Sequence, residues 1–167
     1  MRGRRFDETD LRILTELQRD GRITFQHLAR IVGLSPRPCL ERVRRLEREG
    51  IITGYSALVN LTKLLATTVT VIVRITVKQG REPRIRFEQQ LKNCPAVVEC
   101  FQVSGMFDYV VKVVCSDIDS YRQLSESWLD DASMQVERLE SNVVLRATKD
   151  DGIYPVAIAE LQALVPR

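Results

Sequence analysis

Apolar residues in the first third of the chain recur every three or four positions in three successive segments. This spacing places them on one side of a helix. Each segment opens on a residue that can cap a helix N-terminus, namely Asp7, Thr24 or Ser35, and each ends at a glycine. The pattern predicts three helices that bury their narrow apolar stripes in one shared core.

The second and third helices are separated by the short stretch GLS, which is helix-turn-helix spacing. The third helix is predicted over residues 36–49, with prolines in the first turn, where a missing N–H costs nothing. We expect the Ser35 hydroxyl to accept a hydrogen bond from that turn. The predicted inner stripes are Leu11, Leu14 and Leu17 with Ile13 alongside; Leu28, Ile31 and Val32; and Cys39, Leu40, Val43 and Leu46.

From residue 54 onward the apolar pattern changes from helical spacing to β-branched runs with alternation. Residues 54–59 (GYSALV) are predicted to form an extended strand in a connector. Further strands are predicted at 67–79, 96–105, 108–116 and 136–148, with helices at 81–93 and 117–131. The order βαββαβ is that of a ferredoxin-like unit. In its second helix, the residues expected to face the sheet are Ile118, Tyr121, Leu124 and Leu129.

The predicted fold class is therefore α+β, with an N-terminal helix-turn-helix followed by a ferredoxin-like βαββαβ domain. The expected domains are residues 1–53 for the helix-turn-helix, 54–66 as connector, 67–147 for the ferredoxin-like domain, and 148–167 as a tail with a helix after Pro155. Both helices of the second domain cover one face of its sheet. We expect a second subunit to cover the other.

Charge is unevenly distributed along the chain. The net charge of the 167 residues is +3, but residues 1–50 carry +4 and residues 51–167 carry −1. All basic residues of the first part are arginines, whose forked guanidinium suits phosphate and guanine. This split indicates a nucleic-acid-binding module followed by a nearly neutral domain.

Several function classes are excluded or disfavoured by composition. No apolar run approaches the roughly 20 residues that span a membrane, and the N-terminus has no apolar signal segment. The four cysteines show no zinc spacing, and His27 is the single histidine, so no metal, cofactor or His-based catalytic site is expected. His27 itself is expected at the surface. Free thiols favour a reducing cytoplasm.

The arginine side of the third helix has two interpretations. It is either a solvated surface on which Glu and Arg support each other, or a recognition helix that enters DNA. The helix-turn-helix spacing favours recognition, with Arg37 nearest the bases. The residues predicted to contact DNA are Ser35, Arg37, Glu41, Arg44, Arg45 and Arg48.

The stretch SGMFDY between two predicted strands offers what a free amino acid needs. Gly105 leaves backbone N–H groups open to a carboxylate, and Asp108 can pair with an ammonium. Met106 and Phe107 can line a pocket for an apolar side chain. The alternative is a plain hairpin turn, since Gly and Asp are common turn residues; an assembly contact is a third possibility.

Three phrases of the sequence resemble the Lrp/AsnC (leucine-responsive, or feast/famine) family of prokaryotic transcription factors. They are DETDLRILTELQRDGR, LARIVGLSPRPCLERVRRLEREGII and VSGMFDYVVKV, and the resemblance covers nearly the whole chain. The stretch before the last predicted strand, DDASMQVE, lacks the Pro-Gly that the family usually shows. The resemblance implies a winged helix-turn-helix that binds DNA (residues 1–53), followed by a ferredoxin-like effector-binding and oligomerisation domain (residues 67–147). It also implies a cytoplasmic, nucleoid-associated bacterial or archaeal regulator, with dimers that assemble into octamers.

By the same resemblance, an amino-acid effector binds where second domains meet. The implied effector-binding residues are Ser104, Gly105, Met106, Phe107, Asp108, Ile118, Asn142, Val143 and Val144. Two other classes of function stay open. One is an architectural protein that compacts DNA without a ligand. The other is an enzyme, which is disfavoured because no phosphate loop or nucleophile–base pair occurs.

Overall fold

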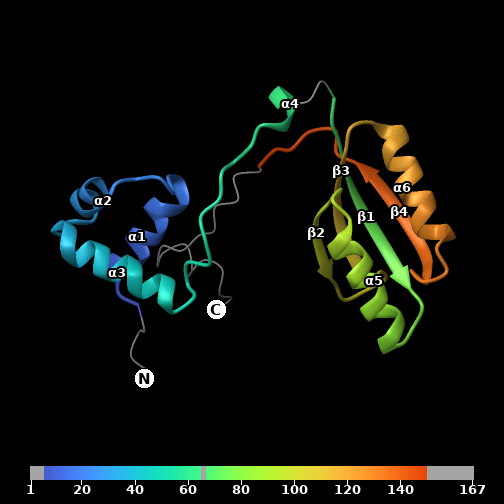
Figure 1. Ribbon diagram of the computed structural model, residues 1–167, viewed down its shortest axis with the longest axis horizontal. Helices are drawn as coiled ribbons and strands as arrows, with labels where there is room; N and C mark the ends of the chain where they lie inside the picture. Colours follow the sequence, from blue (N-terminus) through green and yellow to red (C-terminus); the bar gives the residue numbers. More distant parts are fainter. Residues whose placement is uncertain (1–5, 65–66, 150–167) are drawn as a thin grey trace. The chain divides into compact units, whose positions relative to one another are not determined.

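Helices α1 (Glu8–Arg19), α2 (Phe25–Val32) and α3 (Pro36–Arg48) form the first of two units in the chain (Figure 1). The structure is a computed structural model that describes residues 6–64 and 67–149. The first unit extends to Leu58 and the second begins at Val59. The predicted three-helix arrangement is confirmed.

Local sequence signals set the ends of these helices. Asp7 caps α1 by accepting from the Asp10 N–H at 2.8 Å, and Asp10 accepts from the Asp7 N–H in return at 3.1 Å. Thr24 caps α2. Ser35 occupies the N-cap of α3, but its hydroxyl makes no capping bond, so that prediction is wrong. The third helical residue is Pro38, which lacks the N–H that such a hydroxyl often accepts.

One apolar cluster joins the three helices. Its fully or almost fully buried members are Ile13, Leu28, Ala29, Val32, Cys39, Val43 and Leu46. The predicted stripes of α2 and α3 are largely confirmed. In α1 the central residue is Ile13, while Leu14 and Leu17 are only partly buried, because the short α2 covers one side of α1.

The connector differs from its predicted form. Residues 53–60 contain no strand, and Tyr55, Leu58 and Val59 are exposed. A strand needs a hydrogen-bonded neighbour, and none of the described strands pairs with this segment. Tyr55 instead donates from its hydroxyl to Glu47 Oε1 at 3.0 Å. A short helix that was not predicted, α4 (Leu61–Leu64), follows.

The second unit has the predicted βαββαβ order (Figure 1). Its elements are β1 (Val69–Val77), α5 (Arg81–Asn93), β2 (Val97–Gln102), β3 (Tyr109–Cys115), α6 (Ile118–Asp130) and β4 (Val136–Val143). The four strands pair antiparallel in the order β2-β3-β1-β4, so β2 and β4 are the edge strands. The predicted ferredoxin-like fold class is confirmed.

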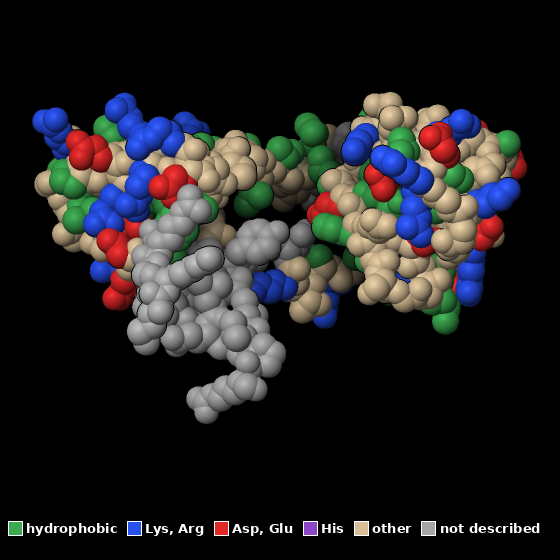
Figure 2. Space-filling model, turned by 90° about the horizontal axis from the view of Figure 1, so that it is seen from below, with side chains coloured by type: hydrophobic (Ala, Val, Ile, Leu, Met, Phe, Trp, Pro, Cys, Tyr) green, Lys and Arg blue, Asp and Glu red, His purple; other side chains and the backbone are tan. Residues whose placement is uncertain are grey.

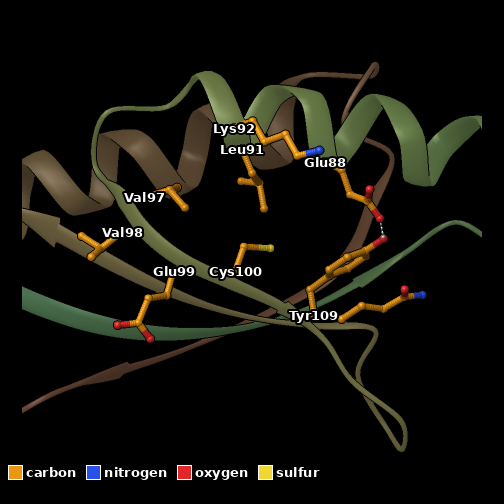
Figure 3. Close-up of a pocket in the computed structure, with 9 residues that line it drawn as sticks. Glu88, Leu91, Lys92, Val97, Val98, Glu99, Cys100 and Tyr109 are labelled. Carbon is orange, nitrogen blue, oxygen red and sulfur yellow. Dashed lines mark hydrogen bonds between the residues drawn. The ribbon is translucent and has the colours of Figure 1, made fainter. Parts of the chain in front are cut away.

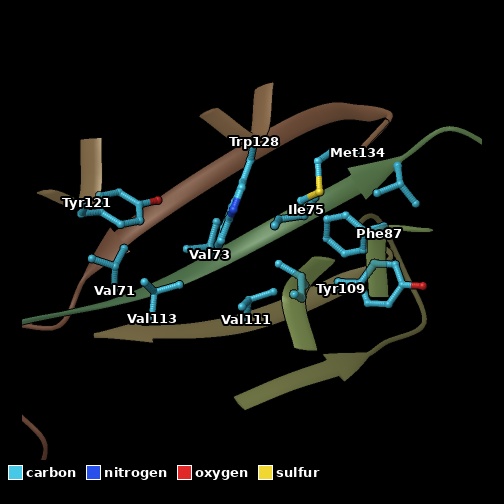
Figure 4. Close-up of a cluster of buried hydrophobic side chains, with 12 residues drawn as sticks. Val71, Val73, Ile75, Phe87, Tyr109, Val111, Val113, Tyr121, Trp128 and Met134 are labelled. Atoms are coloured by element: carbon cyan, nitrogen blue, oxygen red, sulfur yellow. The ribbon is translucent and has the colours of Figure 1, made fainter. Parts of the chain in front are cut away.

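Alternate residues of the central strands point to one face of the sheet, where both helices pack (Figure 4). Phe87 and Leu91 of α5 and Tyr121 and Trp128 of α6 meet this face. The strand residues buried there are Val71, Val73, Ile75, Val77, Tyr109, Val111 and Val113. Within the described residues, neither α5 nor α6 covers the other face of the sheet.

The inward side of α6 was predicted only in part. Tyr121 and Leu124 face the sheet as expected, but Ile118 and Leu129 are exposed. Trp128 takes the inner position instead, one residue and about 100° around the helix from Leu129. Ile118 is the first helical residue. The predicted tail helix lies outside the described residues, and none of the helices within them is long and apolar enough to cross a membrane.

The turn into β4 contains a left-handed residue that is not glycine. Gln135 has φ +51°, and its carbonyl accepts from the Lys78 N–H at 2.9 Å. This backbone conformation costs a non-glycine residue about 1–2 kcal/mol. A glycine at this position would adopt the same conformation without the strain that glutamine carries.

We therefore expect Gln135→Gly to stabilise the second unit by about 0.5–1 kcal/mol, after allowing for the greater freedom of glycine in the unfolded chain. Thermal unfolding of the full chain measures the effect. Gln123→Gly is the matched control, because Gln123 is exposed inside α6 and glycine there should destabilise by about 1 kcal/mol. A lower melting temperature for Gln135→Gly would contradict the assignment of strain.

Candidate functional site

The outer side of α3 presents a stripe of four exposed residues. Arg37, Glu41, Arg44 and Arg48 follow one another at intervals of four, three and four, so they lie within a narrow arc of the helix. Cys39, Val43 and Leu46 occupy the opposite side and are buried. Packing of α3 into the unit therefore leaves the arginine stripe facing outward.

The stripe carries a net positive charge. The Arg37 Nε lies 3.4 Å from Glu41 Oε1, but both side chains are exposed, and such pairs are weak in water. Arg44 and Arg48 are also exposed. Figure 2 shows Lys and Arg side chains gathered over the first unit, with fewer acidic ones between them. Ser35 is exposed at the N-terminus of the same helix.

Arg45 faces a different direction from the rest of the predicted DNA-contact set. Its Nη2 lies 2.5 Å from Oδ2 of Asp10, a residue that is only 1% exposed. The neighbouring Arg42 binds the other Asp10 oxygen at 2.8 Å and Asp7 Oδ2 at 2.6 Å. The two guanidinium groups thus connect α3 to the N-terminal turn of α1.

Hydrogen bonding favours the charged forms of Asp7 and Arg42. The Asp10 N–H and the Arg42 guanidinium hold the pKa of Asp7 below its usual value. The carboxylates of Asp7 and Asp10 raise the pKa of Arg42. At neutral pH Asp7 and Arg42 therefore hold their charges, and their ion pair joins the start of α1 to α3.

Sequence reasoning did not identify Arg42 or Asp10. Asp10 stands three and four residues before Ile13 and Leu14, on the inner side of α1. An acid on an apolar stripe predicts a cationic partner, because a buried carboxylate is rarely left unpaired. The position of Asp10 on the apolar stripe therefore predicts that a cationic side chain pairs with it, but does not identify which arginine does so.

The predicted effector loop is the hairpin between β2 and β3. Its ends are joined by a hydrogen bond from the Val103 N–H to the Asp108 carbonyl at 2.8 Å. Gly105 has φ +121°, and a side chain built there would meet no atom within 4 Å. Met106 is 75% exposed at the tip. Open space beside Gly105 thus allows a ligand to approach the backbone.

Asp108 has partners within the fold. Its Oδ2 accepts from the Val77 N–H at 3.1 Å, and its Oδ1 lies 3.3 Å from Arg84 Nη2. The Asp108 N–H also donates to the Ile75 carbonyl at 2.9 Å. This residue therefore anchors the hairpin to β1 and α5, whatever else its carboxylate binds.

The Phe107 ring is contacted by two arginine side chains, so it is not a free apolar surface for lining a ligand pocket. The guanidinium carbons of Arg74 and Arg138 lie 5.4 and 5.1 Å from its ring centroid. Glu140 pairs with both arginines, at 3.4 and 2.5 Å. The loop's base is thus polar, on the sheet face that carries no helix.

The remaining predicted effector residues lie at the opposite end of the sheet. Asn142 pairs with Ile72, and the Val144 N–H donates to the Thr70 carbonyl at 2.9 Å. Asp108 instead contacts Ile75 and Val77, so the two groups are separated by several residues of β1, roughly 15 Å. Ile118 and Val143 are exposed near the Asn142 end. One copy of the chain does not bring all nine residues together.

Two family comparisons cover nearly all of the described chain. Residues 6–53 match the winged helix-turn-helix DNA-binding family, and residues 70–154 match the Lrp/AsnC ligand-binding domain. The chain belongs to the Lrp/AsnC family of transcriptional regulators. It is a DNA-binding regulator with a ligand-binding domain, and not an enzyme.

Individual relatives support the assignment of this Lrp/AsnC regulator. The transcriptional regulatory protein DoeX of Halomonas elongata is 42% identical over 146 residues, covering 87% of this chain and 91% of its own. The leucine-responsive regulatory protein of Escherichia coli is 46% identical over 123 residues, covering 73% and 74%. A Neisseria meningitidis regulator solved with L-methionine has a TM-score of 0.82 and 28% identity, covering 96% and 99%.

Proposed function

We propose that this regulator binds specific operator sequences through α3 and that a free amino acid modulates the binding. The observation that carries the DNA-binding part is the exposed arginine stripe, held outward by the buried stripe of the same helix. In a helix-turn-helix the N-terminal part of the second helix reaches base edges. Ser35, Arg37, Glu41 and Arg44 then read bases, and Arg48 binds phosphate.

Arg45 belongs to the proposed interface in a double role. One guanidinium nitrogen binds Asp10, while its side chain remains 37% exposed. A guanidinium has five N–H donors, so a phosphate can be bound while the Asp10 contact persists. Arg45 in this proposal fixes the helix and adds a phosphate contact.

The proposed effector site combines two copies of the chain. The hairpin Ser104–Asp108 of one copy supplies open N–H groups for the α-carboxylate and the Asp108 carboxylate for the α-ammonium. Ile118 and residues 142–144 of another copy close the site, because they are too distant within one chain. The related Neisseria regulator was solved with L-methionine, which supports an amino acid as the ligand.

An effector between copies changes DNA binding by favouring one arrangement of subunits. We propose homodimers that assemble into octamers, acting on the chromosome in the cytoplasm. The proposed domain limits are 1–53, 54–66, 67–147 and 148–167. A coupling free energy of about 1–3 kcal/mol corresponds to about 5–150-fold in DNA affinity.

The test begins with thermal unfolding of the full chain against each of the twenty amino acids, because a ligand of the folded state raises apparent stability. Operator affinity is then measured with and without the amino acid that gives the largest shift. Asp108→Asn keeps an acceptor for the Val77 N–H but removes the charge, so it should abolish the response.

Arg84→Gln is the matched control, because it breaks the same ion pair while leaving the Asp108 carboxylate in place. It should keep the response. If Asp108→Asn responds like wild type, the ammonium role fails and the residue is only an anchor. If no amino acid shifts unfolding or DNA affinity, the architectural function replaces the effector-responsive one.

A further inference from the structure

Arg44 stands between two glutamates of α3 and pairs with neither. Glu41 lies three residues before it and Glu47 three residues after it, and residues at this spacing are neighbours on the helix surface. A pair with the same spacing does form in α1, where Arg19 Nη1 lies 3.0 Å from Glu16 Oε1. Among the described residues, no acidic side chain pairs with Arg44.

Each of the two glutamates has a different partner. Glu41 Oε1 lies 3.4 Å from the Arg37 Nε. Glu47 Oε1 accepts a hydrogen bond at 3.0 Å from the hydroxyl of Tyr55, which belongs to the connector and not to α3. A single contact from outside the helix therefore engages the carboxylate that would otherwise be free to pair with Arg44.

Tyr55 is itself held in place by the first unit. A Cβ added to Gly21 would lie 3.5 Å from Tyr55 Cδ1, so the ring rests on the backbone just after α1. The Ile52 N–H donates to the Leu46 carbonyl at 3.2 Å, which fixes the chain between α3 and Tyr55. Burial and the Glu47 carboxylate raise the pKa of Tyr55 to about 12, so its hydroxyl remains a donor at neutral pH.

We propose that Tyr55 is a positioning residue for DNA recognition, because its hydroxyl holds the Glu47 carboxylate toward the connector and away from Arg44. The Arg44 guanidinium is thereby left free to bind DNA. Without the hydroxyl, Glu47 pairs with Arg44 as Glu16 pairs with Arg19, and this pair has to break before DNA binds. The inference rests on the proposed role of Arg44 in reading bases.

Tyr55→Phe tests the proposal, because it removes the hydroxyl and keeps the ring on Gly21. The probe is duplex DNA selected from a random pool by the wild-type full chain. We expect Tyr55→Phe to bind this DNA about 2–5-fold more weakly, since a glutamate–arginine pair must break on each recognition helix of the proposed dimer. Binding isotherms at low salt, where ion pairs are least screened, measure the change.

Glu47→Gln separates this electrostatic effect from a disturbed fold. Glutamine carries no charge to neutralise Arg44, so adding Tyr55→Phe to Glu47→Gln should cause no further loss of DNA affinity. The coupling between the two substitutions is obtained from the four proteins of this double-mutant cycle. If Tyr55→Phe weakens binding equally with and without Glu47→Gln, its effect is structural and the proposal is overturned.

Tyr109→Phe is the matched control in the second unit. The Tyr109 hydroxyl also donates to a glutamate, Glu88, at 2.8 Å, beside a groove of about 450 Å³ between β2 and α5 (Figure 3). Its loss should leave DNA affinity unchanged. If Arg44→Ala weakens binding and Tyr55→Phe does not, the positioning role fails while recognition by α3 stands. If Arg44→Ala binds like wild type, the recognition surface fails, and the positioning role fails with it.

Discussion

Asp10→Ala is expected to lower the free energy of unfolding of the first unit by about 2–3 kcal/mol. Removing one member of a buried ion pair costs about 3–5 kcal/mol when the remaining charge stays buried. The Arg42 and Arg45 side chains are 29% and 37% exposed, so water partly compensates their loss of a partner. Chemical denaturation of the full chain followed by circular dichroism measures the change.

The same substitution is expected to weaken operator binding even where the protein is folded. Without Asp10, Arg45 loses its carboxylate partner on α1 and Arg42 keeps only its contact with Asp7, so α3 is oriented less firmly on α1. Glu8→Ala is the matched control, because it removes an exposed acid from the same first turn. If Asp10→Ala matches Glu8→Ala in both stability and DNA affinity, the network does not position α3.

Arg44→Ala is expected to weaken operator binding by about 30-fold or more. A good contact between a guanidinium and a base edge contributes about 1–3 kcal/mol, and the proposed dimer would insert two recognition helices. The loss is expected to be largest on the operator and small on unrelated DNA, because base contacts carry the specificity. Binding isotherms on both DNAs at two salt concentrations measure it.

Arg48→Ala and Arg122→Ala complete this experiment. Arg48→Ala should weaken operator and unrelated DNA alike, and reduce the dependence of affinity on salt by about one phosphate contact per helix. Arg122 is an exposed arginine on α6, paired with Glu126, so its replacement should leave DNA affinity unchanged. Equal effects of Arg44→Ala and Arg122→Ala would mean that α3 does not recognise DNA.

The sequence by itself determined the order and type of nearly every element. The signals used were local, so they could be read without knowledge of the fold. They are the helix caps at Asp7 and Thr24, the glycine at position 50, and the change from helical to alternating apolar spacing. The outward stripe of α3 followed from the same periodicity. The three sequence stretches that resemble the Lrp/AsnC family extended the prediction to function, because together they span both domains of the chain.

Tertiary structure decided which polar groups meet. Arg45 was predicted to contact DNA, and packing of α3 on α1 also brings its guanidinium to Asp10, 35 residues away in the sequence. Asp108 likewise proved to hold β1 and α5 through Val77 and Arg84. Such pairs depend on distances between elements, which periodicity within one element does not contain.

The strand predicted at residues 54–59 fails for a related reason. Its residues suit an extended conformation, yet a strand exists only where another strand offers hydrogen bonds, and β1–β4 do not. The separation of the hairpin at Gly105 from Asn142 is also a property of strand register alone. Sequence therefore determines what each segment of this protein can form, while the pairing of segments determines which residues share a site.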